Sequence, residues 1–125
     1  MGPKVIGKMN NNTEQTEIKA PPHAAIRGDI ERIKSLSIRR LDTDQVVSTK
    51  GRESWMLAQL IVTGPKGFTT LERPAPRISH YAFLLRKHGL PVETLNESHG
   101  GPYSGHHGRY VLNLPVQIVA QEFAQ

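Results

Sequence analysis

Apolar side chains recur with a helical period in two segments of the chain. Residues 52–63 carry a broad apolar face, and residues 77–88 carry a narrower one with the spacing i, i+4, i+7. The members of the narrower stripe are Ile78, Ala82 and Leu85. A glycine follows each segment, at positions 64 and 89, where it can end a helix. The pattern therefore predicts two helices, each with one buried face.

A third, shorter helix is expected between these two. Thr69 and Glu72 have the spacing of a capping box, in which hydroxyl and carboxylate each accept a main-chain N–H of the other residue. Pro74 and Pro76 follow closely and should keep this helix short. Pro76 also suits the first turn of the helix over 77–88. The expected order is helix, short helix, helix.

The C-terminal half changes to a strand pattern. Residues 91–95 form a short strand by composition, and residues 109–114 combine β-branched and aromatic residues with alternation. A glycine-rich loop over 98–108 joins them, so we expect a β-hairpin. Pro115 ends the second strand, and residues 116–125 are expected to be a short C-terminal tail, with a helical turn or a strand in it.

The N-terminal part is expected to lie outside this unit, which we place at 51–115. Residues 1–25 are polar, and we expect a disordered tail there. In residues 26–41, three isoleucines lie at i, i+4 and i+7, which predicts an amphipathic helix that Asp29 can cap. This helix would pack on the main domain, form a homodimer contact or reach phosphates. Residues 42–50 are expected to be a polar linker.

Composition narrows the functional class. The 125 residues carry a net charge of +5, which suits a polyanionic partner because phosphate neutralisation releases counterions. The absence of cysteine excludes disulfides, thiolate zinc sites and a cysteine nucleophile. No apolar run approaches the ~20 residues that span a bilayer, so we expect a cytoplasmic protein without membrane contact. Paired carboxylates, phosphate loops and nucleophile motifs are missing, so we expect neither an enzyme nor a cofactor.

Candidate DNA-binding residues lie on the helix over 77–88. When its apolar stripe faces inward, the opposite face and its flanks can enter the major groove. The residues there are Arg77, Ser79, His80, Phe83, Arg86 and Lys87. The alternative interpretation is a solvated basic face. An outward aromatic such as Phe83 needs a partner, which could be this chain, a second subunit or a thymine methyl.

The loop over 98–108 is the second candidate, because no acidic residue lies between His99 and Arg109. We expect His106, His107 and Arg109 to contact phosphate or the minor groove. A mobile polar loop is the alternative. A zinc site from His99, His106 and His107 is a third, but neighbouring histidines rarely coordinate one ion well, so we expect no metal. Additional phosphate contacts are expected from Lys66, Thr69, Thr70, Arg39 and Arg40.

Several motifs in this order resemble the short winged helix-turn-helix proteins of bacteria and their phages. The motifs are Thr69-Thr70-Leu71-Glu72, Arg77-Ile78-Ser79, Leu85-Arg86, Gly89, Pro91-Val92-Glu93-Thr94 and Gly108-Arg109-Tyr110-Val111-Leu112. The resemblance covers residues 52–114. It implies an α+β fold of three helices and a β-hairpin wing, with duplex DNA as partner and no catalysis. The sequence departs from the family pattern at Arg73-Pro74-Ala75-Pro76, which replaces the usual continuation of the second helix.

Two functions are consistent with these features. One is a small phage- or bacterial-type regulator that reads DNA with the helix over 77–88 and the wing over 98–108. The other is a protein-interaction module or inhibitor, such as a phage-encoded one, that uses the same fold as a docking surface. Duplex binding should weaken steeply with salt, whereas a protein contact centred on Phe83 and Trp55 should not.

Overall fold

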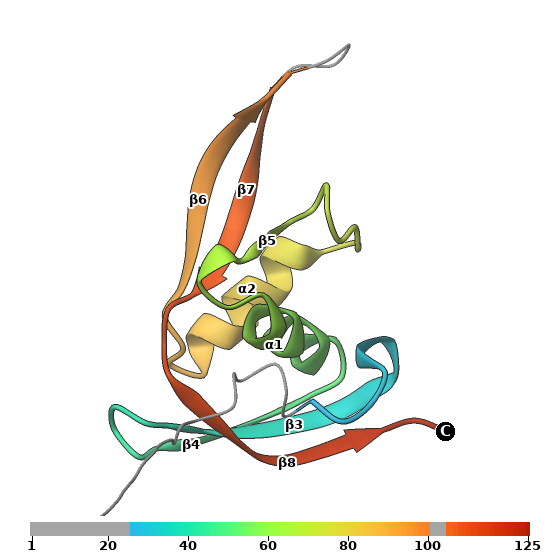
Figure 1. Cartoon of the computed structure of the whole chain (residues 1–125), viewed down its shortest axis with the longest axis vertical. Coiled ribbons are helices and arrows are strands. Elements are labelled where there is room, and N and C mark those ends of the chain that lie inside the picture. The colour runs from blue at the N-terminus through green and yellow to red at the C-terminus, as the bar shows by residue number, and fades with distance from the viewer. Residues whose placement is uncertain (1–25, 101–104) are drawn as a thin grey trace, which may run out of the picture.

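The computed structural model describes residues 26–100 and 105–125, so the disordered tail predicted for 1–25 lies outside the described part. Two α-helices lie between two three-stranded sheets (Figure 1). Two strands of one sheet, β6 and β7, form a long hairpin that projects from one end of the molecule. The elements in order are the 3-10 turn η2 (Ile30–Arg32), β3 (Ile33–Arg40), β4 (Val46–Lys50), α1 (Arg52–Thr63), the 3-10 turn η3 (Gly64–Lys66), β5 (Phe68–Thr69), α2 (Ile78–Lys87), β6 (Val92–His99), β7 (Gly105–Leu112) and β8 (Val116–Phe123).

Both helices predicted from the apolar pattern are confirmed. The helix expected over 52–63 is α1, and the helix expected over 77–88 is α2. Gly64 and Gly89 follow them with φ values of 59° and 90°, a conformation that glycine adopts without strain. The stripe of Ile78, Ala82 and Leu85 is buried as predicted.

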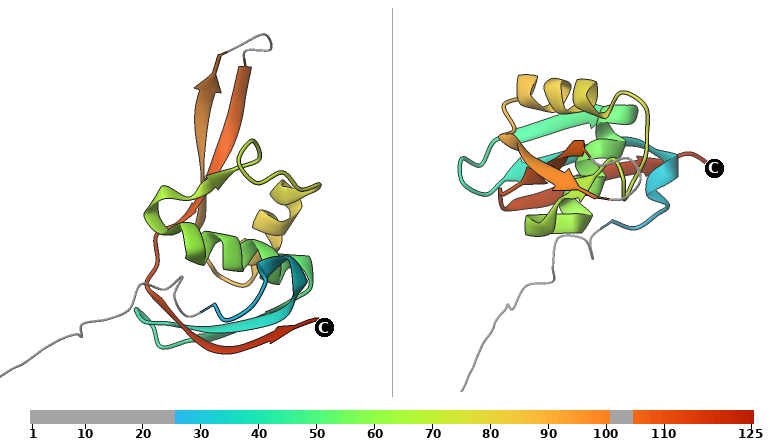
Figure 2. Two further views of the ribbon diagram at one scale, coloured as in Figure 1. Left: turned by 45° about the vertical axis from the view of Figure 1, so that its right-hand side comes forward. Right: turned by 90° about the horizontal axis from the view of Figure 1, so that it is seen from above.

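Helix α1 forms the centre of the core. Its residues 54–61 are all buried, because it packs against β3 on one side and against α2 and β7 on the others. Figure 2 shows α1 enclosed in this way. Trp55 is 2% exposed and meets the ring of Phe68 edge-on, with centroids 6.2 Å apart. The alternative function as a docking module named a contact centred on Phe83 and Trp55, and the Trp55 part of it is wrong, since this side chain lies inside the core.

The amphipathic helix predicted for 26–41 is wrong, and with it the proposed dimer helix. Asp29 does cap a turn, accepting from the N–H of Glu31, but the turn is the short η2. Strand β3 follows, in which the buried Leu36 and Ile38 alternate with Ser35 and Ser37. This period of two outweighs the i, i+4, i+7 spacing of the isoleucines, because β3 gains strand partners on both edges.

The sheet around β3 also recruits two segments that were expected to be irregular. Strand β4 lies in the predicted linker over 42–50, and β8 lies in the predicted C-terminal tail. The strand order is β4-β3-β8, and both pairings are antiparallel. The unit that folds together thus extends on both sides of 51–115.

The third helix of the predicted fold is absent from the described residues, which contain two α-helices. The capping box does form: the N–H of Thr69 donates to Glu72 Oε1, and the N–H of Glu72 donates to Thr69 Oγ1, both at 3.2 Å. The turn stops after Arg73, because Pro74 has no N–H to continue it. Residues 68–69 pair with β7 as β5 instead.

The predicted hairpin is confirmed, and it is longer than expected. Strands β6 and β7 pair from Val92 opposite Leu112 to His99 opposite Gly105, so most of the predicted loop over 98–108 is strand. At Gly108 a Cβ would lie 3.0 Å from Thr94 Cγ2, so the glycine permits a close cross-strand approach. We call this β6–β7 hairpin the wing.

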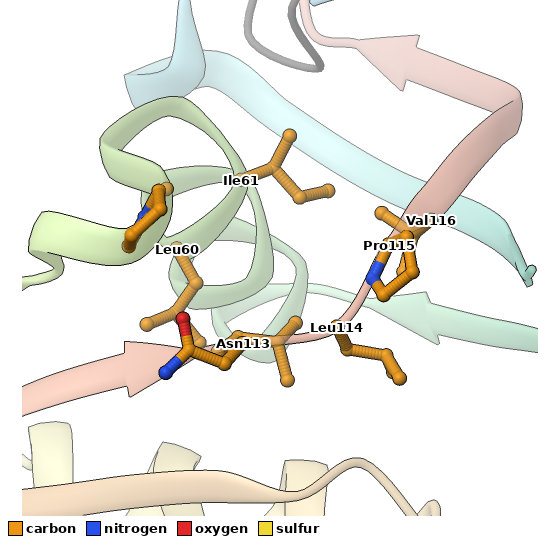
Figure 3. Close-up of a pocket in the computed structure, with 9 residues that line it drawn as sticks. Leu60, Ile61, Asn113, Leu114, Pro115 and Val116 are labelled. Carbon is orange, nitrogen blue, oxygen red and sulfur yellow. The ribbon is translucent and has the colours of Figure 1, made fainter. Parts of the chain in front are cut away.

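An apolar pocket of about 460 Å³ lies between the end of α1 and the segment that joins β7 to β8 (Figure 3). Leu60 and Ile61 line it from the helix, and Leu114, Pro115 and Val116 line it from the joining segment. No titratable side chain lines the pocket. No helix of the described part is long and apolar enough to cross a membrane.

Candidate nucleic-acid interface

The outward face of α2 consists of His80, Phe83 and Lys87, as the position of the buried stripe requires. Phe83 is 53% exposed. Its ring lies nearly parallel to that of His80, with centroids 6.3 Å apart and an interplanar angle of 24°. Lys87 Nζ lies 5.6 Å from the Phe83 centroid, within cation–π range. The three side chains form one continuous surface of a ring flanked by nitrogen donors.

The N-terminal end of α2 adds two exposed polar side chains, Arg77 and Ser79. Arg77 is the N-cap and has a φ of 65°, a left-handed conformation that side chains rarely adopt. Within residues 26–100 and 105–125, neither side chain has a hydrogen bond or ion pair. Both are therefore available to a partner at this end of the helix.

Arg86 lies on the flank of α2 and is engaged inside the chain. Its Nε donates to the carbonyl of Val92 and one terminal nitrogen donates to Thr94 Oγ1, both at 2.8 Å. Val92 and Thr94 belong to β6, so this guanidinium holds the wing against the helix. A residue that the sequence analysis predicted as a DNA contact thus has a positioning role in the fold.

Arg109 lies midway along β7, opposite Leu95, and its side chain is heavily hydrogen-bonded. Its Nε donates to Glu97 Oε2 at 2.6 Å, and its terminal nitrogens lie 3.4 Å from the carboxylate of Glu72 and 3.2 Å from the carbonyl of Lys66. The hydrogen bonds from Arg109 lower the pKa of Glu97 and of Glu72 below their ordinary value. These bonds join β6, β7 and the turn after β5.

The two histidines of β7 differ in their surroundings. His107 Nε2 lies 3.2 Å from Glu97 Oε1, so it belongs to the cluster at Arg109. His106 is exposed near the wing tip, opposite Ser98. Among the residues that the structure describes, no three histidine, aspartate or glutamate side chains are grouped so that they could hold a metal ion.

The additional phosphate candidates are scattered. Lys66 and Thr70 are exposed near the base of the wing, whereas Thr69 is buried in its capping box. Arg39 and Arg40 belong to β3, in the other sheet, and lie near Asp44 and Asp42. Arg40 also donates to the carbonyl of Gly89, and its hydrogen bond to Asp42 lowers the pKa of that carboxyl. Arg40 thus reaches the C-terminal end of α2, whereas Arg39 is paired with Asp44, which lies between β3 and β4.

Sequence reasoning missed Glu72 and Glu97 as partners of the predicted phosphate contacts. The acid-free interval between His99 and Arg109 concealed them, because both acids come from other segments. One signal was present: in a hairpin, Glu97 on the first strand lies opposite residues near 107 on the second. The surroundings of Arg109 and His107 are therefore more nearly neutral than residues 99–109 alone indicate.

Comparison with known proteins gives one family. Residues 46–122 match a family described as a winged helix domain, which is more than half of the chain and includes β4, both helices, the wing and most of β8. No curated protein matches the chain. No solved structure matches it either. Winged helix domains commonly bind DNA. In this chain the helix and the hairpin of such a domain are α2 and the wing. The chain belongs to the winged helix domain family.

Proposed function

We propose that this protein binds duplex DNA, with the outward face of α2 in the major groove and the wing beside the adjacent backbone. The observation that carries the proposal is the charge of α2. From Arg77 to His88 the segment contains three basic residues and two histidines and no acidic residue. A B-DNA major groove is wide enough for one helix, and its phosphates favour such a face.

The structure divides the cations near this face into two groups. Arg86 and Arg109 donate to acceptors inside the chain. Lys66, Arg77 and Lys87 are exposed and form no ion pair within the described residues. If these three cations each neutralise one phosphate, log K should fall with log salt at a slope of roughly −2.7. A role as a small gene regulator, of phage or bacterial type, belongs to the same proposal.

The test is fluorescence anisotropy with a labelled pool of 30-bp random duplexes over a salt series. Lys87→Gln should weaken binding about eightfold at 0.1 M salt and make the slope shallower by about 0.9, as loss of one phosphate contact requires. Arg39→Gln is the matched control: it removes one cation from the other sheet and should leave both quantities unchanged. Arg86 is unsuitable for this test because its loss would release the wing.

A second candidate, a protein-docking surface, is favoured by the exposed Phe83. Wild-type protein that shows no salt-sensitive binding to the duplex pool would contradict the DNA proposal and favour docking. Binding that is unchanged in Lys87→Gln would contradict the placement of α2 in the groove.

A further inference from the structure

The ring of Phe83 is the most unusual feature of the outward face of α2. It is the one large exposed aromatic side chain among the described residues; the other large exposed apolar residues are aliphatic. It lies four residues after Ser79 and four before Lys87, in the middle of the surface that would meet a partner. An apolar group in this position is removed from water only if the partner offers an apolar group to cover it.

The orientation of the ring is set by its neighbours. The His80 ring stacks on it at 6.3 Å, and Lys87 Nζ lies 5.6 Å from its centroid. Both contacts come from the same helix, at i−3 and i+4, so they hold the ring without any partner present. A ring that is already ordered loses little side-chain entropy when it is bound.

The surroundings of the ring limit what can cover it. Its charged or ionisable neighbours within residues 77–88 are Arg77, His80, Tyr81, Arg86, Lys87 and His88, and this segment contains no aspartate or glutamate. Arg86 donates to β6 and His88 lies 3.3 Å from Glu53, so Arg77, His80 and Lys87 are the basic side chains left beside the ring. The complementary surface is therefore an apolar group set in an anionic environment. The major groove of DNA offers one such group, the C5-methyl of thymine, which lies between two phosphate backbones.

We infer that Phe83 is a specificity-determining residue that covers a thymine methyl, so that the protein prefers thymine at one position of its site. This inference rests on the proposed DNA binding. The neighbouring Ser79, His80 and Lys87 supply hydrogen bonds to base edges or phosphates, and Phe83 supplies the one apolar contact. Burial of a single methyl group corresponds to about a fourfold change in affinity.

The test begins with selection of bound sequences from the random 30-bp duplex pool. One enriched duplex is then prepared with deoxyuridine in place of deoxythymidine at the most strongly enriched thymine, which removes the methyl and keeps every hydrogen-bonding group. Wild type should bind the deoxyuridine duplex about fourfold more weakly. Phe83→Ala should bind both duplexes equally; the residue is exposed and alanine favours helix, so the fold is retained. Val46→Ala, an exposed apolar residue of the other sheet, should discriminate as wild type does.

The possible failures are distinguishable. If wild type binds the pool but its affinity is unchanged when the methyl group of any enriched thymine is removed, the inference is overturned and the proposed function stands. Undiminished discrimination by Phe83→Ala overturns the assignment to this residue. If wild type shows no salt-sensitive binding to the pool, the proposed function fails, and a protein partner becomes the explanation for the exposed ring.

Discussion

Gly67 controls how closely β5 approaches the wing, and its replacement by alanine tests this part of the fold. It has φ 67° and ψ −165°, a region that is nearly exclusive to glycine. A Cβ there would overlap the carbonyl oxygen of Tyr110 and lie 2.7 Å from Val111 Cγ2. Both neighbours belong to β7, and the adjacent Phe68 is fully buried. Gly67→Ala must therefore displace β5 from β7.

The expected loss of stability has two parts. The backbone conformation costs an alanine about 1–3 kcal/mol, and overpacking against a strand costs about 1–3 kcal/mol more. The sum, about 2–6 kcal/mol, is a large fraction of the about 5–15 kcal/mol that stabilises a typical domain. Gly51 separates the two parts: it has φ 67° and ψ −141°, but a Cβ there would meet nothing within 4 Å. Gly51→Ala should therefore lose only the conformational part.

The assay is urea unfolding followed by far-UV circular dichroism and by the fluorescence of Trp55, the only tryptophan of the chain. Gly67→Ala should be less stable than Gly51→Ala by about 1–3 kcal/mol. Coincident transitions for the two probes would show that the comparison is between two-state proteins. If the two variants have equal free energies of unfolding, the close approach of β5 to β7 does not constrain the fold, and the reasoning is refuted.

Two further predictions concern buried and charged groups. Thr49→Val should lower the free energy of unfolding by about 1–3 kcal/mol in the same urea assay, because the buried Ser54 hydroxyl, 2.7 Å from Thr49 Oγ1, loses its partner. Thr49→Ser keeps a hydroxyl and should be destabilised less. Equal destabilisation by the two substitutions would contradict this prediction. Since Arg109 lowers the pKa of Glu97 in the folded state, this carboxylate stabilises the protein above its ordinary pKa of 4.5 and loses that effect as pH falls through the lowered value. Glu97→Gln should therefore lose less stability than wild type between pH 5 and pH 3, whereas Glu93→Gln, on the same strand, should behave as wild type does.

The helices and the hairpin could be predicted because their signals are local. In α2, a stripe of three apolar residues and the following Gly89 determine which face is buried and where the helix ends. The hairpin likewise joins segments that are adjacent in sequence. Once the buried stripe is known, the outward position of His80, Phe83 and Lys87 follows from the 3.6-residue period.

The capping box could not show that the predicted short helix is absent, because such a box stabilises a first turn whether or not a helix continues. Thr69 and Glu72 form the box in the structure, yet Pro74 leaves only one turn for it to stabilise. The strand β3 was missed for the opposite reason. Its alternation of buried Leu36 and Ile38 with Ser35 and Ser37 is short and overlaps the helical spacing of the isoleucines, and one of its two partners, β8, lies about 80 residues later.

The charged residues of the site show a related limit. A sequence reveals how many cations a segment carries, but whether each faces a partner depends on acceptors from other segments. Arg86 meets β6, and Arg109 meets acids of β6 and of the turn after β5.

These two arginines also explain how the wing keeps its position beside α2. The Arg86 guanidinium on α2 bonds to β6. The Arg109 guanidinium on β7 bonds to Glu72 in the turn after β5 and to the carbonyl of Lys66. The turn itself is closed by Glu72, which accepts from both Thr69 and Arg109. Glu72 therefore couples the remnant of the missing helix to the wing. In this domain, whose expected second helix is reduced to one turn, Glu72 is the side chain that bonds this turn to β7.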